Sequence, residues 1–157
     1  MKPLEELITL NGARAAIIGA GGAARAICYG LLERGASVTI YARDVQKAQS
    51  LAAEFNINAA SISAFKGDAD IVINCTPVGM RGANEGISPL NVYALGKVQL
   101  VYDLIYNPLE TQLLKDAKAA GCQTLGGMAM LISQAAEQFR LWTGEEGPMD
   151  VMWRAVS

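Results

Sequence analysis

The sequence has no histidine among its 157 residues, so it lacks the side chain that most often serves as a general base or binds a metal near neutral pH. Cysteine is also scarce, and the three that occur, Cys28, Cys75 and Cys122, are odd in number and widely spaced. This pattern favours buried free thiols over a disulfide framework or a metal site. Both shortages argue against a self-contained hydrolase, and no metal is expected.

The chain also has neither a large excess of charge of one sign nor long apolar runs. The chain has 13 Lys and Arg against 15 Asp and Glu, so no basic surface for nucleic acid is indicated. Its apolar runs are about eight residues or shorter, whereas a membrane-spanning helix needs about 20. Residues 1–12 carry acids where a signal peptide has its apolar region. We therefore expect a soluble, cytoplasmic protein with no nucleic-acid or membrane partner.

What the chain does contain is an alternation of apolar, strand-like segments with amphipathic, helix-like ones. Strands are expected at 13–19, 37–43, 70–76, 98–106 and 122–125, and helices at 22–34, 45–55, 109–121, 128–144 and 149–156. Apolar strands separated by helices predict a parallel sheet covered on both faces, which is a doubly wound, Rossmann-like α/β domain. Segments 61–69 and 79–97 are expected to be loops, and the second is a candidate functional loop.

The first expected strand runs into the glycine-rich turn 19–24, whose sequence GAGGAA fits the dinucleotide fingerprint G-x-G-x-x-[G/A]. Gly19 allows the tight strand-to-helix turn, Gly21 lets backbone approach a pyrophosphate, and Ala24 lets the helix pack closely on the strand. The pattern alone is weak, since many glycine-rich turns bind nothing. Its place in the first strand–turn–helix unit favours a nucleotide site over a purely structural turn.

The end of the second expected strand indicates which nucleotide. An NAD site usually has an acidic residue there, whereas this strand ends at Ala42 and Arg43, with Lys47 one helical turn later. Arg43 and Lys47 could contact one anion, as the 2′-phosphate of NADP requires. Cations in a first helical turn oppose the helix dipole, so a bound anion explains them better than solvation does. Asp44 is expected to cap the next helix, although a role on a ribose hydroxyl keeps NAD open.

Five stretches of the chain resemble the C-terminal, nucleotide-binding domain of shikimate dehydrogenases. They are GAGGAARA (19–26), INCTPVGM (73–80), VYDLIYNPLETQLL (101–114), GGMAMLISQAAEQFRLWTG (126–144) and PMDVMWRAV (148–156). That family reduces 3-dehydroshikimate reversibly to shikimate with NADP, in aromatic amino-acid biosynthesis. The resemblance therefore implies an NADP-dependent oxidoreductase. A quinate/shikimate dehydrogenase that uses NAD and a stand-alone, non-catalytic nucleotide-binding module remain the alternatives.

The resemblance also implies roles for particular residues. Those implied for the cofactor are Gly19, Ala20, Gly21, Gly22, Ala23, Ala42, Arg43, Asp44, Lys47, Thr76, Val78, Leu104 and Gly127. Those implied for the substrate are Tyr106 and Gln134. Ala42 and Asp44 depart from the family's Asn-Arg-Thr-x-x-Arg pattern, which leaves mixed use of NAD and NADP open.

The residues themselves add weight to some of these roles. Thr76 supplies a hydroxyl at a strand end, where open α/β sheets expose their ligand-binding loops. Tyr106 ends an apolar strand and could either pack or contact substrate. Gln134 lies on an apolar helix face, where its amide needs hydrogen-bond partners. Met128, Met130 and Phe139 are expected to form part of the core, and Trp142 and Trp153 are expected simply to pack.

In the family, the catalytic lysine and aspartate lie in an N-terminal domain. Residues 1–11 are expected to be a remnant of the helix between domains, 12–144 the dinucleotide-binding domain, and 145–157 a C-terminal helix that packs toward that domain. We therefore expect a fragment with no catalytic residue of its own, inactive alone. Apolar surface left around Leu4, Leu7, Met149 and Trp153 would favour self-association.

Overall fold

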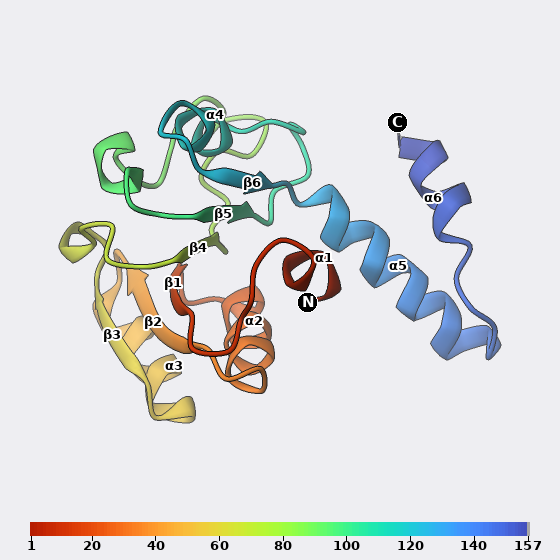
Figure 1. Ribbon diagram of the computed structural model, residues 1–157, viewed down its shortest axis with the longest axis horizontal. Helices are drawn as coiled ribbons and strands as arrows, with labels where there is room; N and C mark the ends of the chain where they lie inside the picture. Colours follow the sequence, from red (N-terminus) through yellow and green to blue (C-terminus); the bar gives the residue numbers. More distant parts are fainter. Residues whose placement is uncertain (157) are drawn as a thin grey trace.

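A parallel sheet forms the centre of the molecule, with helices on both of its faces (Figure 1). The computed structural model describes residues 1–156. Its six strands lie in the order β3-β2-β1-β4-β5-β6, with the bounds β1 Arg14–Ile18, β2 Ser37–Ala42, β3 Asn58–Ser61, β4 Ile71–Asn74, β5 Leu100–Asp103 and β6 Gln123–Leu125. The helices are α1 Lys2–Glu5, α2 Gly22–Leu32, α3 Val45–Phe55, α4 Gln112–Ala119, α5 Met128–Thr143 and α6 Met149–Val156, with short 3-10 helices η1 Ile62–Ala64 and η2 Val92–Leu95. This arrangement confirms the predicted doubly wound, Rossmann-like α/β fold.

Alternate side chains of the strands enter two separate cores, which is why the strands are apolar throughout. Along β1, Ala15 and Ile17 belong to the core shared with α1, α2 and α3, whereas Ala16 and Ile18 belong to the core shared with α4 and η2. Every residue of β4 and β5 is buried. A strand covered on both faces has no side for polar residues, and the sequence showed this pattern.

Two elements differ from the sequence-based prediction. The strand β3 was not anticipated, because its sequence NAAS has no apolar run; it lies at the sheet edge, pairs only with β2 and is only partly buried. The helix expected over 109–121 begins instead at Gln112, because the Thr111 side chain accepts a hydrogen bond from the Leu114 amide at 3.3 Å. Thr111 thus satisfies an amide that the first helical turn leaves open.

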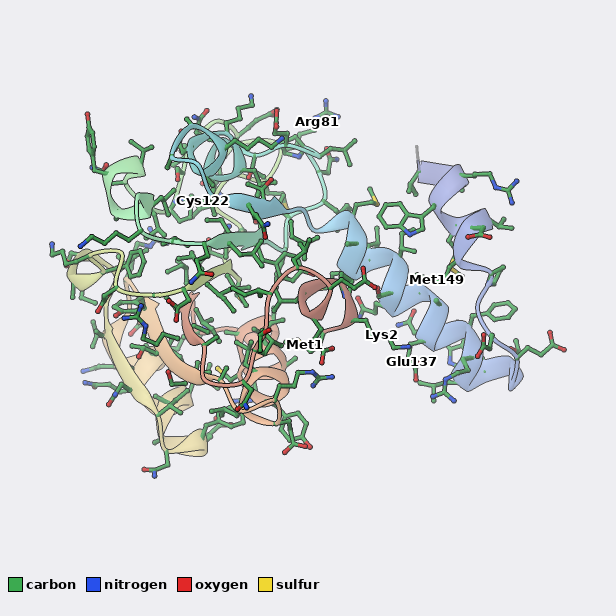
Figure 2. The ribbon with its side chains drawn as sticks, viewed as in Figure 1. Met1, Lys2, Arg81, Cys122, Glu137 and Met149 are labelled. Carbon is green, nitrogen blue, oxygen red and sulfur yellow. The ribbon has the colours of Figure 1, made fainter. Side chains whose placement is uncertain are left out.

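The C-terminal part of α5 and the whole of α6 form an arm that extends away from the sheet (Figure 1). Glu137 and Met149 lie on this arm, well apart from Cys122 in the body of the molecule (Figure 2). No residue of α6 is buried. The prediction that Trp142 packs in a core is therefore wrong, since its side chain is 81% exposed, and Trp153 is 39% exposed.

Some of the other expectations about packing are confirmed, and others are wrong. Leu4 was expected on exposed surface, but it is fully buried in the core under α1, whereas Leu7 and Met149 are exposed as expected. Only Lys2–Glu5 of the expected interdomain helix is helical. Met128 and Phe139 are half-buried rather than core residues. The sheet thus leaves several apolar side chains of α5 and α6 exposed, among them Leu141, Trp142 and Val151.

Two local predictions are borne out. The thiols of Cys28, Cys75 and Cys122 are all free; Cys28 and Cys122 are buried, and Cys75 is half-buried. Asp44 does cap α3, because its Oδ1 accepts a hydrogen bond from the Lys47 amide at 3.0 Å. No helix within residues 1–156 is long and apolar enough to cross a membrane.

Candidate functional site

Three adjoining hollows follow the carboxyl edge of the sheet. The β2-end hollow, of about 880 Å³, lies between the glycine turn, the start of α3 and the loop 84–89. The middle hollow, of about 580 Å³, shares Cys75, Thr76 and Pro77 with it. The α5-side hollow, of about 500 Å³, shares Ala23, Leu104 and Met130 with the middle one. Together they cross the point where the strand order reverses beside β1, the usual ligand site of open α/β sheets.

Glycine occupies positions 19, 21 and 22 of the turn for two different reasons. Gly19 has φ +106°, and a Cβ there would lie 2.8 Å from the Thr76 methyl group, so the fold itself requires glycine. A Cβ on Gly21 or Gly22 would meet no heavy atom within 4 Å. The fold therefore tolerates side chains at Gly21 and Gly22, whose smallness instead keeps the wall of the hollows open to a ligand.

The same turn presents the start of α2 to the hollows. Its N-cap residue, Gly21, offers no side-chain cap, and the first turn of the helix contains no acidic residue. Arg25 is the first residue whose amide bonds back, to the Gly21 carbonyl at 3.1 Å. Amides at such a helix start and the helix dipole favour a bound anion.

Two cations line the β2-end hollow beside the glycine turn. Arg43 and Lys47 are both exposed, and within the described residues neither side chain takes part in an ion pair or hydrogen bond. Arg25 differs, because its guanidinium binds the Glu54 carboxylate at 2.7 and 2.9 Å. Asp44, the one acidic residue that lines any of the three hollows, uses Oδ1 to cap α3. The unpaired cations can hold an anionic group such as a phosphate.

The turn after β4 forms the boundary between the β2-end and middle hollows. The Thr76 hydroxyl donates to Asn74 Oδ1 at 2.7 Å and accepts from the Val78 amide at 3.2 Å. Its proton is therefore used inside the chain, and only an acceptor lone pair is left for a ligand. Val78 lines the β2-end hollow with Thr76.

Leu104 and Gly127 meet where β5 passes into its following turn. The Gly127 amide donates to the Ile105 carbonyl at 3.1 Å, and a Cβ on Gly127 would overlap the Leu104 carbonyl. Gly127 therefore lets α5 start directly against β5, but it does not line any of the three hollows. Leu104 lines both the middle and the α5-side hollows.

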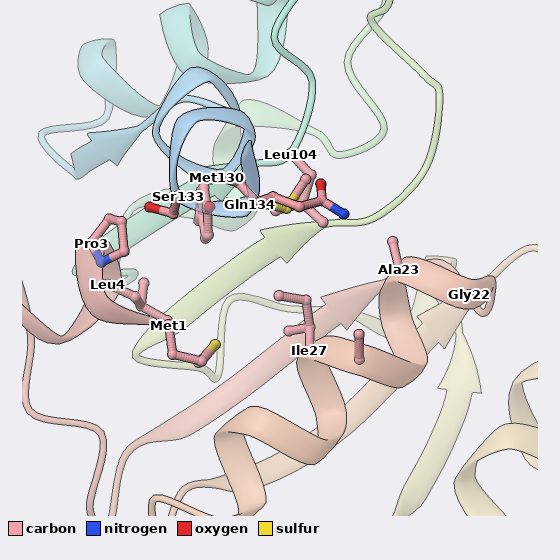
Figure 3. Close-up of a pocket in the computed structure, with 12 residues that line it drawn as sticks. Met1, Pro3, Leu4, Gly22, Ala23, Ile27, Leu104, Met130, Ser133 and Gln134 are labelled. Carbon is pink, nitrogen blue, oxygen red and sulfur yellow. The ribbon is translucent and has the colours of Figure 1, made fainter. Parts of the chain in front are cut away.

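Tyr106 and Gln134 approach the same end of the site from different elements. Tyr106 is 50% exposed and lines the middle hollow, so it is not a packing residue. Gln134 projects from α5 beside Met130 and Leu104, across from Ala23 of α2 (Figure 3). Gln134 shares a helix face with Met130, as expected, but it is exposed to solvent, so its amide needs no hydrogen-bond partner within the chain.

Several lining residues were not predicted. Loop residues supply one wall of the β2-end hollow, namely Asn84, Ile87, Ser88 and Pro89. Met80, Arg81 and Asn107 line the middle hollow. For Arg81 and the residues of 84–89 the only signal was the length of the loop 79–97, whereas Met80 and Asn107 lie in the stretches 73–80 and 101–114 that carry the family resemblance. Met130 was expected in the core, but it is half-buried and lines two hollows.

Burial keeps two titratable side chains that line the hollows in their protonated form. It raises the pKa of the Cys75 thiol and that of Tyr102, the latter to about 12, so both stay protonated at neutral pH. No cluster of metal-ligating side chains occurs in the part of the chain that the structure describes. Cys75 and Tyr102 can therefore contribute to the walls of the site, but neither is a general acid or base near neutrality.

Comparisons with known proteins agree with this geometry. The family described as "Shikimate / quinate 5-dehydrogenase" matches residues 3–80, and the "Shikimate 5'-dehydrogenase C-terminal domain" matches residues 127–156. The curated shikimate dehydrogenase (NADP(+)) of Methanosarcina acetivorans is 40% identical over 98% of this chain and 58% of its own length. The chain thus spans little more than half the length of this relative.

Solved structures show the same fold. A crystal structure of a shikimate dehydrogenase in complex with NADP+ is 36% identical with a TM-score of 0.90, covering 99% of this chain and 57% of its own. Quinate dehydrogenase from Corynebacterium glutamicum, solved with NAD, is 34% identical with a TM-score of 0.85, covering 96% of this chain and 56% of its own. In fold and in sequence, the chain belongs to the shikimate dehydrogenase family.

Proposed function

We propose that this chain is the NADP-binding part of a shikimate dehydrogenase, which reduces 3-dehydroshikimate reversibly to shikimate. One observation carries the choice of cofactor: Arg43 and Lys47, without ion-pair partners in the described chain, line the same hollow as the uncapped start of α2. A dinucleotide with a 2′-phosphate needs two anion sites, one for its diphosphate and one for that phosphate. The three adjoining hollows offer both, and the relative from Methanosarcina acetivorans is named for NADP(+).

The residues of the chain fit the cofactor in order along the sheet edge. Arg43 and Lys47 would hold the 2′-phosphate, with Ala42 and Asp44 beside the adenosine. The backbone of the glycine turn 19–23 would hold the diphosphate, since nothing stands over Gly21 or Gly22. Thr76, Val78 and Leu104 would border the nicotinamide half, and Gly127 would act by allowing α5 to approach Leu104. The bound cofactor supplies the hydride; the chain binds and orients it.

The substrate would sit at the other end of the site. Tyr106 and Gln134 carry a hydroxyl and an amide, suited to the hydroxyls of a cyclic polyol acid. Tyr106 lines the middle hollow with Leu104 and Met130, and Gln134 lies beside the same two residues in the α5-side hollow (Figure 3). Carbonyl reduction also requires a proton, and the amide of Gln134 cannot serve as its acid or base. We propose that another part of the complete enzyme supplies that acid or base.

The domain limits follow from the same proposal. Residues 12–144 form the dinucleotide-binding domain, residues 1–11 belong to the connection between domains, and residues 145–157 pack toward the substrate domain. The exposed apolar side chains of the arm, Leu141, Trp142, Met149 and Val151, support this docking role. In isolation the same surface would favour self-association, which sedimentation at rising protein concentration measures.

A titration calorimetry experiment tests the cofactor. We expect NADP+ to bind the chain more tightly than NAD+ does, and equal affinities would contradict the assignment of the 2′-phosphate site. Asp44 also lies in the β2-end hollow and the quinate dehydrogenase was solved with NAD, so tighter binding of NAD+ would favour the NAD-dependent alternative.

An assay of NADPH formation from shikimate and NADP+ tests the division of roles. The chain alone should be inactive and the complete gene product active. Turnover by the chain alone at a comparable rate would show a proton-transfer group within it.

A further inference from the structure

A buried polar pair joins the carboxyl ends of the neighbouring strands β4 and β5. Asn74 and Asp103 are directly paired in the strand register, and both side chains are completely inaccessible to solvent. Asn74 Nδ2 donates to Asp103 Oδ1 at 3.0 Å. Neither residue lines any of the three hollows, so neither can touch a ligand there.

Asn74 holds the turn that follows its own strand. Its Oδ1 accepts from the Thr76 amide at 3.0 Å and from the Thr76 hydroxyl at 2.7 Å, while its Nδ2 also donates to the Val78 carbonyl at 3.3 Å. The Thr76 hydroxyl in turn accepts from the Val78 amide. The turn 76–78 therefore has its backbone and side-chain polar groups tied to one buried amide.

Asp103 does the same for the segment after β5. Its Oδ1 accepts from the Ile105 amide at 3.1 Å, and its Oδ2 accepts from the Thr111 hydroxyl at 2.6 Å. Thr111 is the residue that caps α4. Asp103 thus fixes the turn that carries Leu104 and Tyr106 and connects it to the next helix.

A buried carboxylate is an expensive way to hold two turns together. Removal from water disfavours the charged form and raises the pKa of Asp103, while its hydrogen bonds to Thr111, Ile105 and Asn74 act in the opposite direction. In the described chain, no buried side-chain polar atom is left without a partner. Two apolar residues would fill the same space without the desolvation cost, but they would fix neither turn.

The two turns that this pair controls both line the middle hollow. Thr76 and Pro77 of the turn after β4, and Leu104, Ile105 and Tyr106 of the turn after β5, are among its lining residues. We propose that Asn74 and Asp103 are positioning residues that set the spacing of these two turns, and with it the nicotinamide end of the cofactor site. The ligand part of this inference rests on the proposed function, while the effect on the turns does not.

The test compares variants at Asn74 and Thr76 with two ligands and one ligand-free measurement. Asn74→Ala removes the centre of the network. Thr76→Val removes the hydroxyl at constant size, and Thr76→Ser keeps the hydroxyl as its matched control. NADP+ spans the whole site, whereas 2′,5′-ADP reaches only the glycine turn and the cations Arg43 and Lys47. Hydrogen exchange of the Val78 and Ile105 amides reports the turns without any ligand.

We expect Asn74→Ala and Thr76→Val to weaken NADP+ binding about tenfold or more, and 2′,5′-ADP binding about twofold or less. Thr76→Ser, which keeps the hydroxyl, should lose clearly less NADP+ affinity than Thr76→Val. A general loss of stability would lower both affinities alike, so the ratio separates positioning from misfolding. Should Asn74→Ala fail to fold, the Thr76 pair gives the same comparison.

Three results would overturn the inference. An equal loss of affinity for NADP+ and 2′,5′-ADP in Asn74→Ala and Thr76→Val would show a structural role only. Loss in Thr76→Val with full affinity in a folded Asn74→Ala would show that the Thr76 hydroxyl contacts the ligand directly. Unchanged exchange of the Val78 and Ile105 amides would show that the network does not hold the turns. A wild-type chain that binds neither ligand would instead refute the proposed function, and the exchange data would still decide whether the pair controls the turns.

Discussion

Replacing Arg43 with alanine should separate the two cofactors. The Arg43 guanidinium is exposed and makes no ion pair or hydrogen bond within the described residues, so no existing interaction is broken when it binds an anion. A hydrogen bond to a charged group contributes about 1.5–3 kcal/mol, which corresponds to about ten- to a hundredfold in affinity. We therefore expect Arg43→Ala to weaken NADP+ binding by that factor and to leave NAD+ binding nearly unchanged.

The measurement is titration calorimetry with NADP+ and NAD+ at two salt concentrations. A control for the lost charge is Lys115→Ala, which removes an exposed cation from α4, in another part of the fold. Thermal unfolding should show little change in either variant, since exposed side chains contribute little to stability. The preference for NADP+ should also weaken at high salt, because the site is exposed and screened. Equal losses for NADP+ and NAD+, or a comparable loss in Lys115→Ala, would refute the assignment of Arg43 to the 2′-phosphate.

Two further predictions concern the glycine turn and the pH dependence of stability. Gly21→Val should abolish NADP+ binding, while circular dichroism and the unfolding midpoint stay near wild type, because a Cβ at Gly21 meets no heavy atom within 4 Å. Gly19→Ala should instead lower the unfolding midpoint, because its Cβ would lie 2.8 Å from the Thr76 methyl group. Normal binding by Gly21→Val would make the turn structural. The Arg14 guanidinium and amide hydrogen-bond to Asp70 and lower the pKa of that carboxyl. Its stabilising contribution is therefore present above the usual pKa of an aspartate, about 3.9, and disappears as the pH falls through the lowered value. Wild-type protein should lose stability below about pH 4 more steeply than Asp70→Asn, and parallel curves in acid denaturation would contradict this.

Local sequence patterns were sufficient for the fold and for one end of the site. Apolar runs of strand length, separated by helical periodicity, predicted the sheet because each strand is buried on both faces. The glycine turn and the pair Arg43 and Lys47 lie within short segments, so their juxtaposition follows once the first two strands are placed side by side. The strand β3 was not predicted, because its residues NAAS lie at the sheet edge and carry no apolar pattern.

The rest of the site depends on contacts between distant segments. The pairing of Asn74 with Asp103 joins residues 29 positions apart and follows from the register of β4 on β5, which no local pattern specifies. The wall formed by the loop 84–89 has no periodicity to predict it. The packing role assigned to Trp142 failed for a related reason: the apolar pattern of α5 says that a face is to be covered, but not that the sheet ends before it.

The arrangement of charge suits such a site to an anionic ligand. The cations Arg43 and Lys47 and the free amides at the start of α2 collect at one end, while the end with Tyr106 and Gln134 carries neutral polar groups and the cation Arg81, but no acidic side chain. The buried carboxylate of Asp103 is the nearest acid to that end in the network, but its oxygens are occupied by Asn74, Ile105 and Thr111. A group so fully bonded holds the turns in place and cannot exchange a proton with a ligand. Under the proposed function, this chain supplies binding and geometry, and we expect the proton that accompanies the hydride to come from another part of the enzyme.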